Sequence, residues 1–163
     1  MRAYYGLVDP RLASIYAKDV AETFGGDVEN VKYMLYETAC AETGLGMVKD
    51  PTHRSAGRGL TQFDQIPFFD IINRTSKKDK VLVKEKYDID LDKIESVDEI
   101  NNSPVLAFIM TRLFYKKRRE PIPDNIIDRA HYWKKWYNTE AGKGSADHYL
   151  SMVQWVKDKL GER

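Results

Sequence analysis

The sequence predicts a mostly α-helical domain with one small irregular region, either a loop or a hairpin. Apolar residues recur at helical spacing in several segments, and Asp, Ser and Gly stand where these segments would begin and end. Residues 44–58 contain three glycines and one proline, a pattern too broken for a helix. A chain of 163 residues has the usual size of one domain with one hydrophobic core, so we expect residues 1–163 to form a single domain.

Three helices are predicted in the first half of the chain. Asp9-Pro10 is a typical helix start, and this helix runs through about residue 24, where two glycines follow. Asp27 begins a second helix, which stops at Gly44. After the irregular region, residues 65–67 open a short helix whose apolar side is formed by positions 68, 69, 71 and 72.

The second half is also predicted to be helical. A lysine-rich segment, 76–86, leads to residues 87–102, which we interpret as short helical pieces joined by turns. Ser103-Pro104 starts a helix that is apolar on nearly every side from 105 to 110, as expected of a buried central helix. Asp124 is the predicted cap of a helix over 125–138. A turn at 139–145 then precedes a last helix that ends near Gly161.

Composition and charge argue against several classes of function. A net charge of +1, with 42% hydrophobic and 31% charged residues, gives no overall attraction to nucleic acid or membranes. The three histidines lack partners at metal-ligand spacing and no phosphate-binding loop is present, so we expect neither a metal nor a cofactor. The single cysteine, Cys40, cannot form an intrachain disulfide and is predicted to be a structural filler.

Glu42 has an unusual position in the second predicted helix. The apolar residues from Val28 to Ala41 form one arc of this helix, and Glu42 falls about 20° from Val31, near the middle of that arc. An acid placed there faces the interior or a cleft, in a last helical turn where both desolvation and the helix dipole raise its pKa. A general acid working near neutral pH needs such a raised pKa. Glu37 lies off the arc, so we expect Glu42 to be the chemically important one.

Three short segments carry further signals. They are Glu42-Thr43-Gly44, residues 55–63 (SAGRGLTQF), and Tyr137-Asn138 followed by Ala141-Gly142. Lytic transglycosylases show Glu-Ser, then Gly-Leu-Met-Gln roughly twenty residues later, then Tyr-Asn-Ala-Gly near the C-terminus. Here the separation from Glu42 to Gln62 is 20 residues. In order and spacing the chain therefore resembles the lysozyme-like superfamily, in particular lytic transglycosylases and phage endolysins.

The chain departs from that pattern at four positions. Thr43 stands in place of Ser, Thr61 in place of Met, and Thr139 and Glu140 interrupt the last motif. Glu-Thr-x-Gly together with Gly-Arg-Gly-x-x-Gln also resembles family 19 chitinases, which belong to the same superfamily. These departures affect the choice of the exact family that the chain resembles more than its resemblance to the superfamily.

The resemblance implies a muralytic enzyme of lysozyme-like fold, with the irregular region beside an active-site cleft. Such an enzyme cleaves the β-1,4 bond between N-acetylmuramic acid and N-acetylglucosamine in peptidoglycan, with Glu42 as general acid and base. Two glycines would let the backbone approach a sugar ring, and nearby polar side chains would bind its substituents. The expected substrate-binding residues are Thr43, Ser55, Gly57, Gly59, Gln62, Tyr137 and Asn138.

The resemblance also implies partners and a place of action. We expect a monomer that binds peptidoglycan glycan strands, binds no nucleic acid and does not insert into membranes. The first 16 residues lack the apolar core of a signal peptide. An endolysin of this kind would be made in the host cytoplasm and reach the cell wall after release, or be carried in the virion. Two alternatives are a catalytically inactive lysozyme-fold component of a phage particle and a chitinase-like hydrolase.

The products depend on a second acid. Hydrolysis normally requires a second carboxylate to hold a nucleophile or a water molecule. Asp50 and Asp64 are the candidates, although Asp50 precedes Pro51, where a turn-forming Asp is common. If neither faces Glu42, the 6-hydroxyl of the muramic acid completes the reaction and a 1,6-anhydro end results. We favour this lytic transglycosylase reaction over lysozyme-type hydrolysis.

Overall fold

A computed structural model describes residues 2–49, 57–139 and 142–162. Within these ranges the chain is mostly helical, as predicted, and its β-structure is limited to one isolated bridge between Arg58 and Phe63. The α-helices are α1 (Ala13–Thr23), α2 (Val28–Thr43), α3 (Gln65–Arg74), α4 (Lys77–Tyr87), α5 (Pro104–Lys116), α6 (Ile126–Trp133) and α7 (Ala146–Lys159). Short helical turns are η1 (Pro10–Leu12), η2 (Leu91–Lys93), η3 (Val97–Ile100) and the π-helical η4 (Lys134–Asn138).

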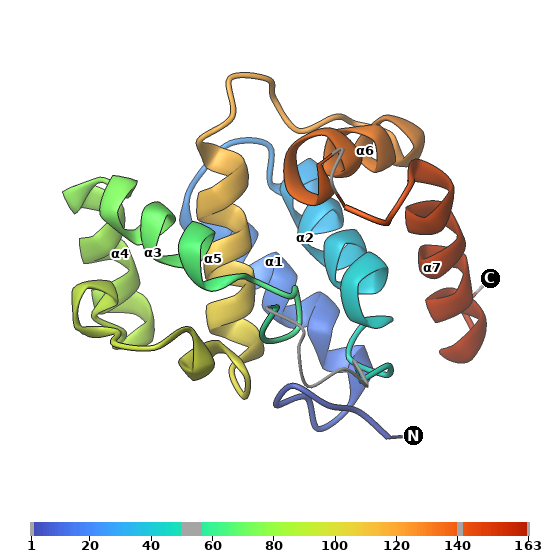
Figure 1. The fold of residues 1–163 in the computed structure, drawn as a ribbon, viewed down its shortest axis with the longest axis horizontal. Helices are drawn as coiled ribbons and strands as arrows, with labels where there is room; N and C mark the ends of the chain where they lie inside the picture. Colours follow the sequence, from blue (N-terminus) through green and yellow to red (C-terminus); the bar gives the residue numbers. More distant parts are fainter. Residues whose placement is uncertain (1, 50–56, 140–141, 163) are drawn as a thin grey trace.

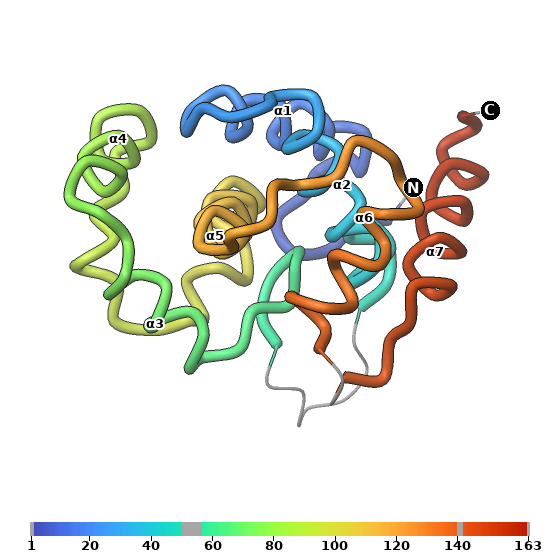
Figure 2. The backbone as a smooth tube through the Cα atoms, turned by 90° about the horizontal axis from the view of Figure 1, so that it is seen from above, coloured from blue at the N-terminus to red at the C-terminus, as the bar shows by residue number. Residues whose placement is uncertain are grey.

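Helix α2 lies among three other helices, since it contacts α1, α5 and α7 (Figure 1). α6 packs against α7, while α3 and α4 lie on the other side of α5, away from α7 (Figures 1 and 2). Among the described helices, none combines the length and apolar character needed to cross a bilayer.

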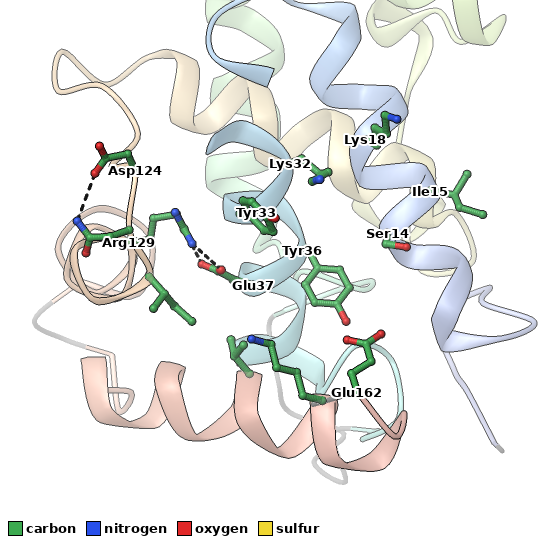
Figure 3. Close-up of a pocket in the computed structure, with 14 residues that line it drawn as sticks. Ser14, Ile15, Lys18, Lys32, Tyr33, Tyr36, Glu37, Asp124, Arg129 and Glu162 are labelled. Atoms are coloured by element: carbon green, nitrogen blue, oxygen red, sulfur yellow. Dashed lines mark hydrogen bonds and ion pairs between the residues drawn. The ribbon is translucent and has the colours of Figure 1, made fainter. Parts of the chain in front are cut away.

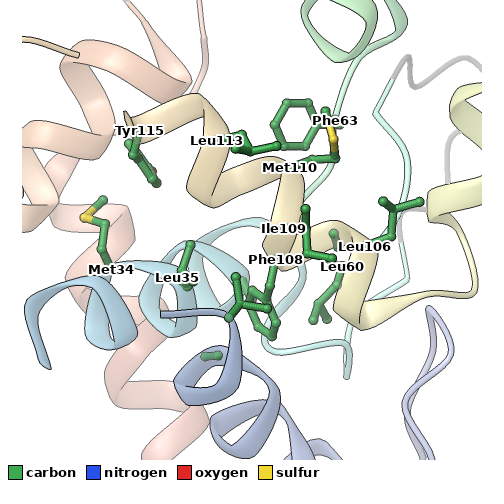
Figure 4. Packing of buried hydrophobic residues seen from close by; sticks show 14 of the residues in the cluster. Met34, Leu35, Leu60, Phe63, Leu106, Phe108, Ile109, Met110, Leu113 and Tyr115 are labelled. Carbon is green, nitrogen blue, oxygen red and sulfur yellow. The ribbon is translucent and has the colours of Figure 1, made fainter. Parts of the chain in front are cut away.

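The core is centred on α5. Every residue from Leu106 to Leu113 is buried, which confirms the predicted buried helix. Figure 4 shows side chains of this helix meeting those of α2 and of the segment around residues 60–63. One hydrophobic cluster includes residues from all the α-helices of the described chain. The segment that carries Leu60 and Phe63 is thus fixed to the core by its apolar side chains.

Local capping explains most helix boundaries. The Asp27 carboxylate accepts a hydrogen bond from the Asn30 amide at 3.0 Å, and Gly44 ends α2 with a φ of 53°. Ser103 caps α5 in the same way. The cap of α6 is Asn125 rather than the predicted Asp124. Helix α4 was predicted only as a lysine-rich segment, because its apolar positions are few and its burial is correspondingly slight.

Glu37 is buried in spite of its position on the helical wheel. It is only 4% exposed, although it lies off the apolar arc of α2. Because α2 contacts three helices, it has more than one buried face, and a single arc does not describe it. Cys40 is also fully buried and free, and burial raises the pKa of its thiol, as suits a structural filler.

Candidate active site

Glu42 lies in the last turn of α2 with a partly exposed side chain. Burial raises the pKa of Glu42 to about 8, a nearby negative charge at Asp64 raises it slightly, and a hydrogen bond from Trp133 opposes the shift. That bond runs from the indole Nε1 to Oε1 of Glu42, at 3.2 Å. The carboxyl group is therefore mostly protonated at pH 7 and can act as a proton donor.

Thr43 connects the end of α2 to the segment 57–63. Its hydroxyl donates to the Leu60 carbonyl at 2.7 Å and accepts from the Gly46 amide at 3.0 Å. The side chain is 2% exposed, so it cannot contact a substrate in this conformation. Thr43 therefore has a structural role instead of the expected contact with substrate. Its hydrogen bond to Leu60 holds the segment 57–63 next to the end of α2, where Glu42 lies.

Residues 58–63 form a tight hairpin. Arg58 and Phe63 exchange two backbone hydrogen bonds, of 2.8 and 2.9 Å. Gln62 closes the turn with a positive φ of 54° and donates its side-chain amide to the Gly59 carbonyl at 2.9 Å. A non-glycine residue with positive φ is uncommon and is often found at functional sites. Gln62 and Gly57 are both partly exposed and stay candidates for substrate contact.

Gly59 serves the fold rather than a ligand. It is buried, and its amide already donates to the Asn101 side chain at 3.2 Å, so the predicted approach of this backbone to a sugar is corrected. A β-carbon at Gly59 would lie 2.8 Å from the Ile100 carbonyl oxygen. A φ of 75° adds a second reason for glycine at this position.

Gly59→Ala is expected to destabilise the protein by about 2–4 kcal/mol, because it combines backbone strain with a clash against Ile100. Gly25 is a matched control: its φ is 77° and nothing lies near its β-carbon position. Gly25→Ala should cost only about 1–2 kcal/mol, from strain alone. Urea unfolding of both variants measures the difference, and equal losses would show that the Ile100 contact has no role.

Tyr137 and Asn138 of the third segment lie in η4, immediately after α6, whereas Ala141 lies outside the described residues. The Tyr137 hydroxyl donates to the Thr61 carbonyl at 2.6 Å rather than to Glu42. Its ring packs edge-on against Phe63 and Phe114. Burial raises the pKa of Tyr137, and the charge of Glu42 raises it further. Tyr137 thus supports the hairpin.

Lys134 holds the end of this segment in place. Its ammonium group donates to the Asn138 side chain at 2.8 Å, to the Thr139 carbonyl at 2.7 Å and to the Gly142 carbonyl at 3.0 Å. Asn138 itself is partly exposed and stays a candidate for substrate contact. Neither Lys134 nor Trp133 was predicted as a site residue. Both residues stand directly before Tyr137-Asn138, in a stretch that also contains Tyr132 and Trp136. This position among aromatic residues is the signal that could have indicated them.

Hydrogen bonds join the second predicted segment to the first and to the third, and a residue just before the third segment bonds to the first. Thr43 bonds to Leu60, which links the first segment to the second. Tyr137 bonds to Thr61, which links the third to the second, and Trp133, next to the third, bonds to Glu42 in the first. Segments that are about 100 residues apart in the sequence therefore meet around one protonated carboxyl group.

Asp64 is the second carboxylate near Glu42. It is exposed at the N-cap position of α3, yet its side chain forms no capping hydrogen bond. Its negative charge contributes to the raised pKa of Glu42, so the two groups interact. The other predicted acid, Asp50, and the predicted binding residue Ser55 lie outside the described residues.

Glu37 belongs to a different site, a buried ion pair with Arg129. The guanidinium donates to both carboxylate oxygens, at 2.7 and 2.9 Å, and the Tyr149 hydroxyl donates to one of them at 2.7 Å. This pair lines a pocket of about 660 Å³ between α1, α2, α6 and α7 (Figure 3). Glu42 does not line that pocket. The pair instead fixes α6, and with it Trp133, against α2.

In the part of the chain that the structure describes, no group of three or more His, Cys, Asp or Glu side chains is arranged to hold a metal ion. Comparison of the chain with protein-family models, with curated proteins and with solved structures finds no match. The assignment of a function therefore depends on the geometry around Glu42 and on the motifs in the sequence.

Proposed function

We propose that the protein is a lysozyme-like peptidoglycan glycosidase that cleaves the β-1,4 bond between N-acetylmuramic acid and N-acetylglucosamine, with Glu42 as its acid and base. The observation that carries the proposal is the Glu42 carboxyl group at the meeting point of the motif segments, where burial raises its pKa to about 8. A role as a phage endolysin or virion-associated lysin is part of the proposal and is supported by the sequence resemblance.

The first step needs only groups near Glu42. The protonated carboxyl gives its proton to the glycosidic oxygen, the bond from this oxygen to the sugar C1 breaks, and the electron pair stays on the leaving oxygen. The sugar passes through an oxocarbenium-like state. The Trp133 N–H, 3.2 Å from Oε1, stabilises the carboxylate that Glu42 then becomes.

In the second step Glu42 takes a proton back from the group that attacks C1. If water attacks, a reducing N-acetylmuramic acid end forms, and a second carboxylate helps to hold the water. If the sugar's own 6-hydroxyl attacks, a 1,6-anhydro end forms. The preference for transglycosylation depended on the absence of an acid facing Glu42. Among the described residues, Asp64 is the one acid whose charge raises the pKa of Glu42, so hydrolysis, with Asp64 as the second carboxylate, is kept as the second candidate reaction.

Mass spectrometry of purified peptidoglycan after digestion tests both the function and the reaction. We expect soluble muropeptides, and those from transglycosylation are one water lighter than those from hydrolysis. Reducing ends, together with a large loss of activity in Asp64→Asn, would establish hydrolysis. Cleavage of chitin but not of peptidoglycan would support the chitinase-like alternative. Absence of products from both polymers would support an inactive structural protein and contradict the proposal.

Trp133→Phe is expected to shift the pH dependence of the activity. The indole hydrogen bond lowers the pKa of Glu42, so its loss raises that pKa, and the fall in activity at alkaline pH moves upward by roughly half to one pH unit. Trp136→Phe, another tryptophan-to-phenylalanine change, is the control, because among the described residues Trp133, and not Trp136, donates the indole hydrogen bond to Glu42. Equal pH profiles for wild type and Trp133→Phe would exclude this role.

A further inference from the structure

A second pocket, of about 270 Å³, lies where the N-terminal end of α2 meets the C-terminal end of α5. Both ends lie at the upper side of Figure 1. The start of α2 contributes Gly26, Asp27 and Asn30, and α5 contributes Arg112. None of these residues belongs to the site around Glu42.

Arg112 is the unusual residue of this pocket. Its side chain is buried, with 7% of the residue exposed. Within the described ranges its guanidinium forms one hydrogen bond, to the Gly25 carbonyl at 3.2 Å, and its buried Nε–H has no partner. No carboxylate pairs with it there. A buried guanidinium has five N–H donors and normally requires an acidic partner, so most of its binding capacity is unused.

The acidic groups around the pocket are already engaged. The Asp27 carboxylate caps α2 through the Asn30 amide. Glu120 pairs with Lys135 at 2.7 Å. The negative charge of Asp79 raises the pKa of Arg112, but the ion pair of Asp79 is with Lys116, at 2.7 Å. None of these carboxylates forms an ion pair with the guanidinium.

The remaining surroundings favour a negative ligand. Arg118 also lines the pocket, and its guanidinium lies over the Phe114 ring and pairs with no carboxylate of the described residues. The 16-residue helix α2 points its N-terminal end, the positive end of its dipole, at the same pocket. A buried unpaired cation, a second cation and a helix N-terminus thus converge on one small cavity.

We propose that this pocket binds an oxyanion of the phosphate or carboxylate class, with Arg112 as its main ligand. Planar guanidinium groups bind both kinds of oxyanion through two parallel hydrogen bonds. The site goes beyond the proposed function and does not depend on it, since no atom of the Glu42 site takes part.

Thermal unfolding and isothermal titration with inorganic phosphate and with acetate, at constant ionic strength against chloride, test the proposal. We expect phosphate, acetate or both to raise the Tm of the wild type and to bind with one site per chain. The ion that binds identifies the class. Glu42→Gln should bind as the wild type does, which keeps this test separate from that of the enzymatic function.

Arg112→Met removes the charge with little change in volume and should abolish the response to both ions. Without added anion this variant should be as stable as the wild type or more so, because an unpaired buried charge is removed. Arg74→Met is the control, since Arg74 is an exposed arginine paired with Asp70, and it should keep the response.

Asn30→Asp is a second variant, in case Arg112→Met does not fold. It adds a negative charge at the pocket in the first turn of α2, where acids are well tolerated, and should weaken anion binding about tenfold. Binding that is absent in the wild type, or unchanged in both Arg112→Met and Asn30→Asp, would overturn the proposal.

Discussion

Glu42→Gln is expected to lower the release of muropeptides from peptidoglycan by a factor of about 10²–10⁴, the usual contribution of a general acid. Glutamine keeps the shape of the side chain and can still accept the Trp133 hydrogen bond, but it cannot supply a proton. The matched control is Glu29→Gln, which removes an exposed acid from the first turn of the same helix. Similar rates for both variants would exclude Glu42 as the acid.

The same substitution should stabilise the protein at alkaline pH. The ordinary pKa of a glutamate, 4.5, applies to the unfolded chain, and the folded value is about 8. Between these values the folded protein keeps a proton that the unfolded chain releases, so wild-type stability falls as pH rises. Relative to Glu42→Gln, the wild type should lose a few kcal/mol across this window and nothing below pH 4.5. Unfolding midpoints at pH 4 and pH 9 give the comparison.

Arg129→Met is expected to destabilise the protein by about 3–5 kcal/mol, because it leaves the Glu37 carboxylate buried without its cationic partner. The Tyr149 hydroxyl alone cannot replace two charged hydrogen bonds. The double variant Glu37→Met/Arg129→Met should recover much of this loss, since no buried charge then remains. Chemical unfolding of the single and double variants measures the recovery.

The control for this prediction is Arg74→Met, which breaks an ion pair whose side chains are both more than half exposed. It should cost no more than about 1 kcal/mol. If Arg129→Met costs as little as Arg74→Met, the buried pair does not hold α6 on α2. Glu37→Gln should also destabilise the protein, because it removes the charge with which the buried Arg129 guanidinium pairs.

Much of the fold was predictable because its signals are local. Caps such as Asp27 and Ser103 and the stop at Gly44 act within a few residues, and they set the helix ends where the sequence placed them. The position of Glu42 on α2 was likewise a local property of helix geometry. Helix α4 was missed because a helix that buries few apolar residues has a weak pattern.

The contacts that make the site were not predictable from one sequence. The partners Trp133 and Glu42 are 91 residues apart, and Arg129 and Glu37 are 92 residues apart. No local pattern carries that information. For the same reason, Thr43 and Gly59 were assigned to the substrate although they hold the hairpin in place. The residue types and their spacing indicated which segments form the site, but not which side chains of these segments face solvent.

A carbon-13 NMR titration of the glutamate side-chain carboxyl groups tests the central claim most directly, namely that the fold makes Glu42 a proton donor at neutral pH. One resonance, absent from the spectrum of Glu42→Gln, should titrate near pH 8, and cleavage of peptidoglycan should decline over the same range. A Glu42 resonance that titrates near pH 4.5 would contradict the claim, because the carboxyl group would then be ionised at the pH where it must donate a proton.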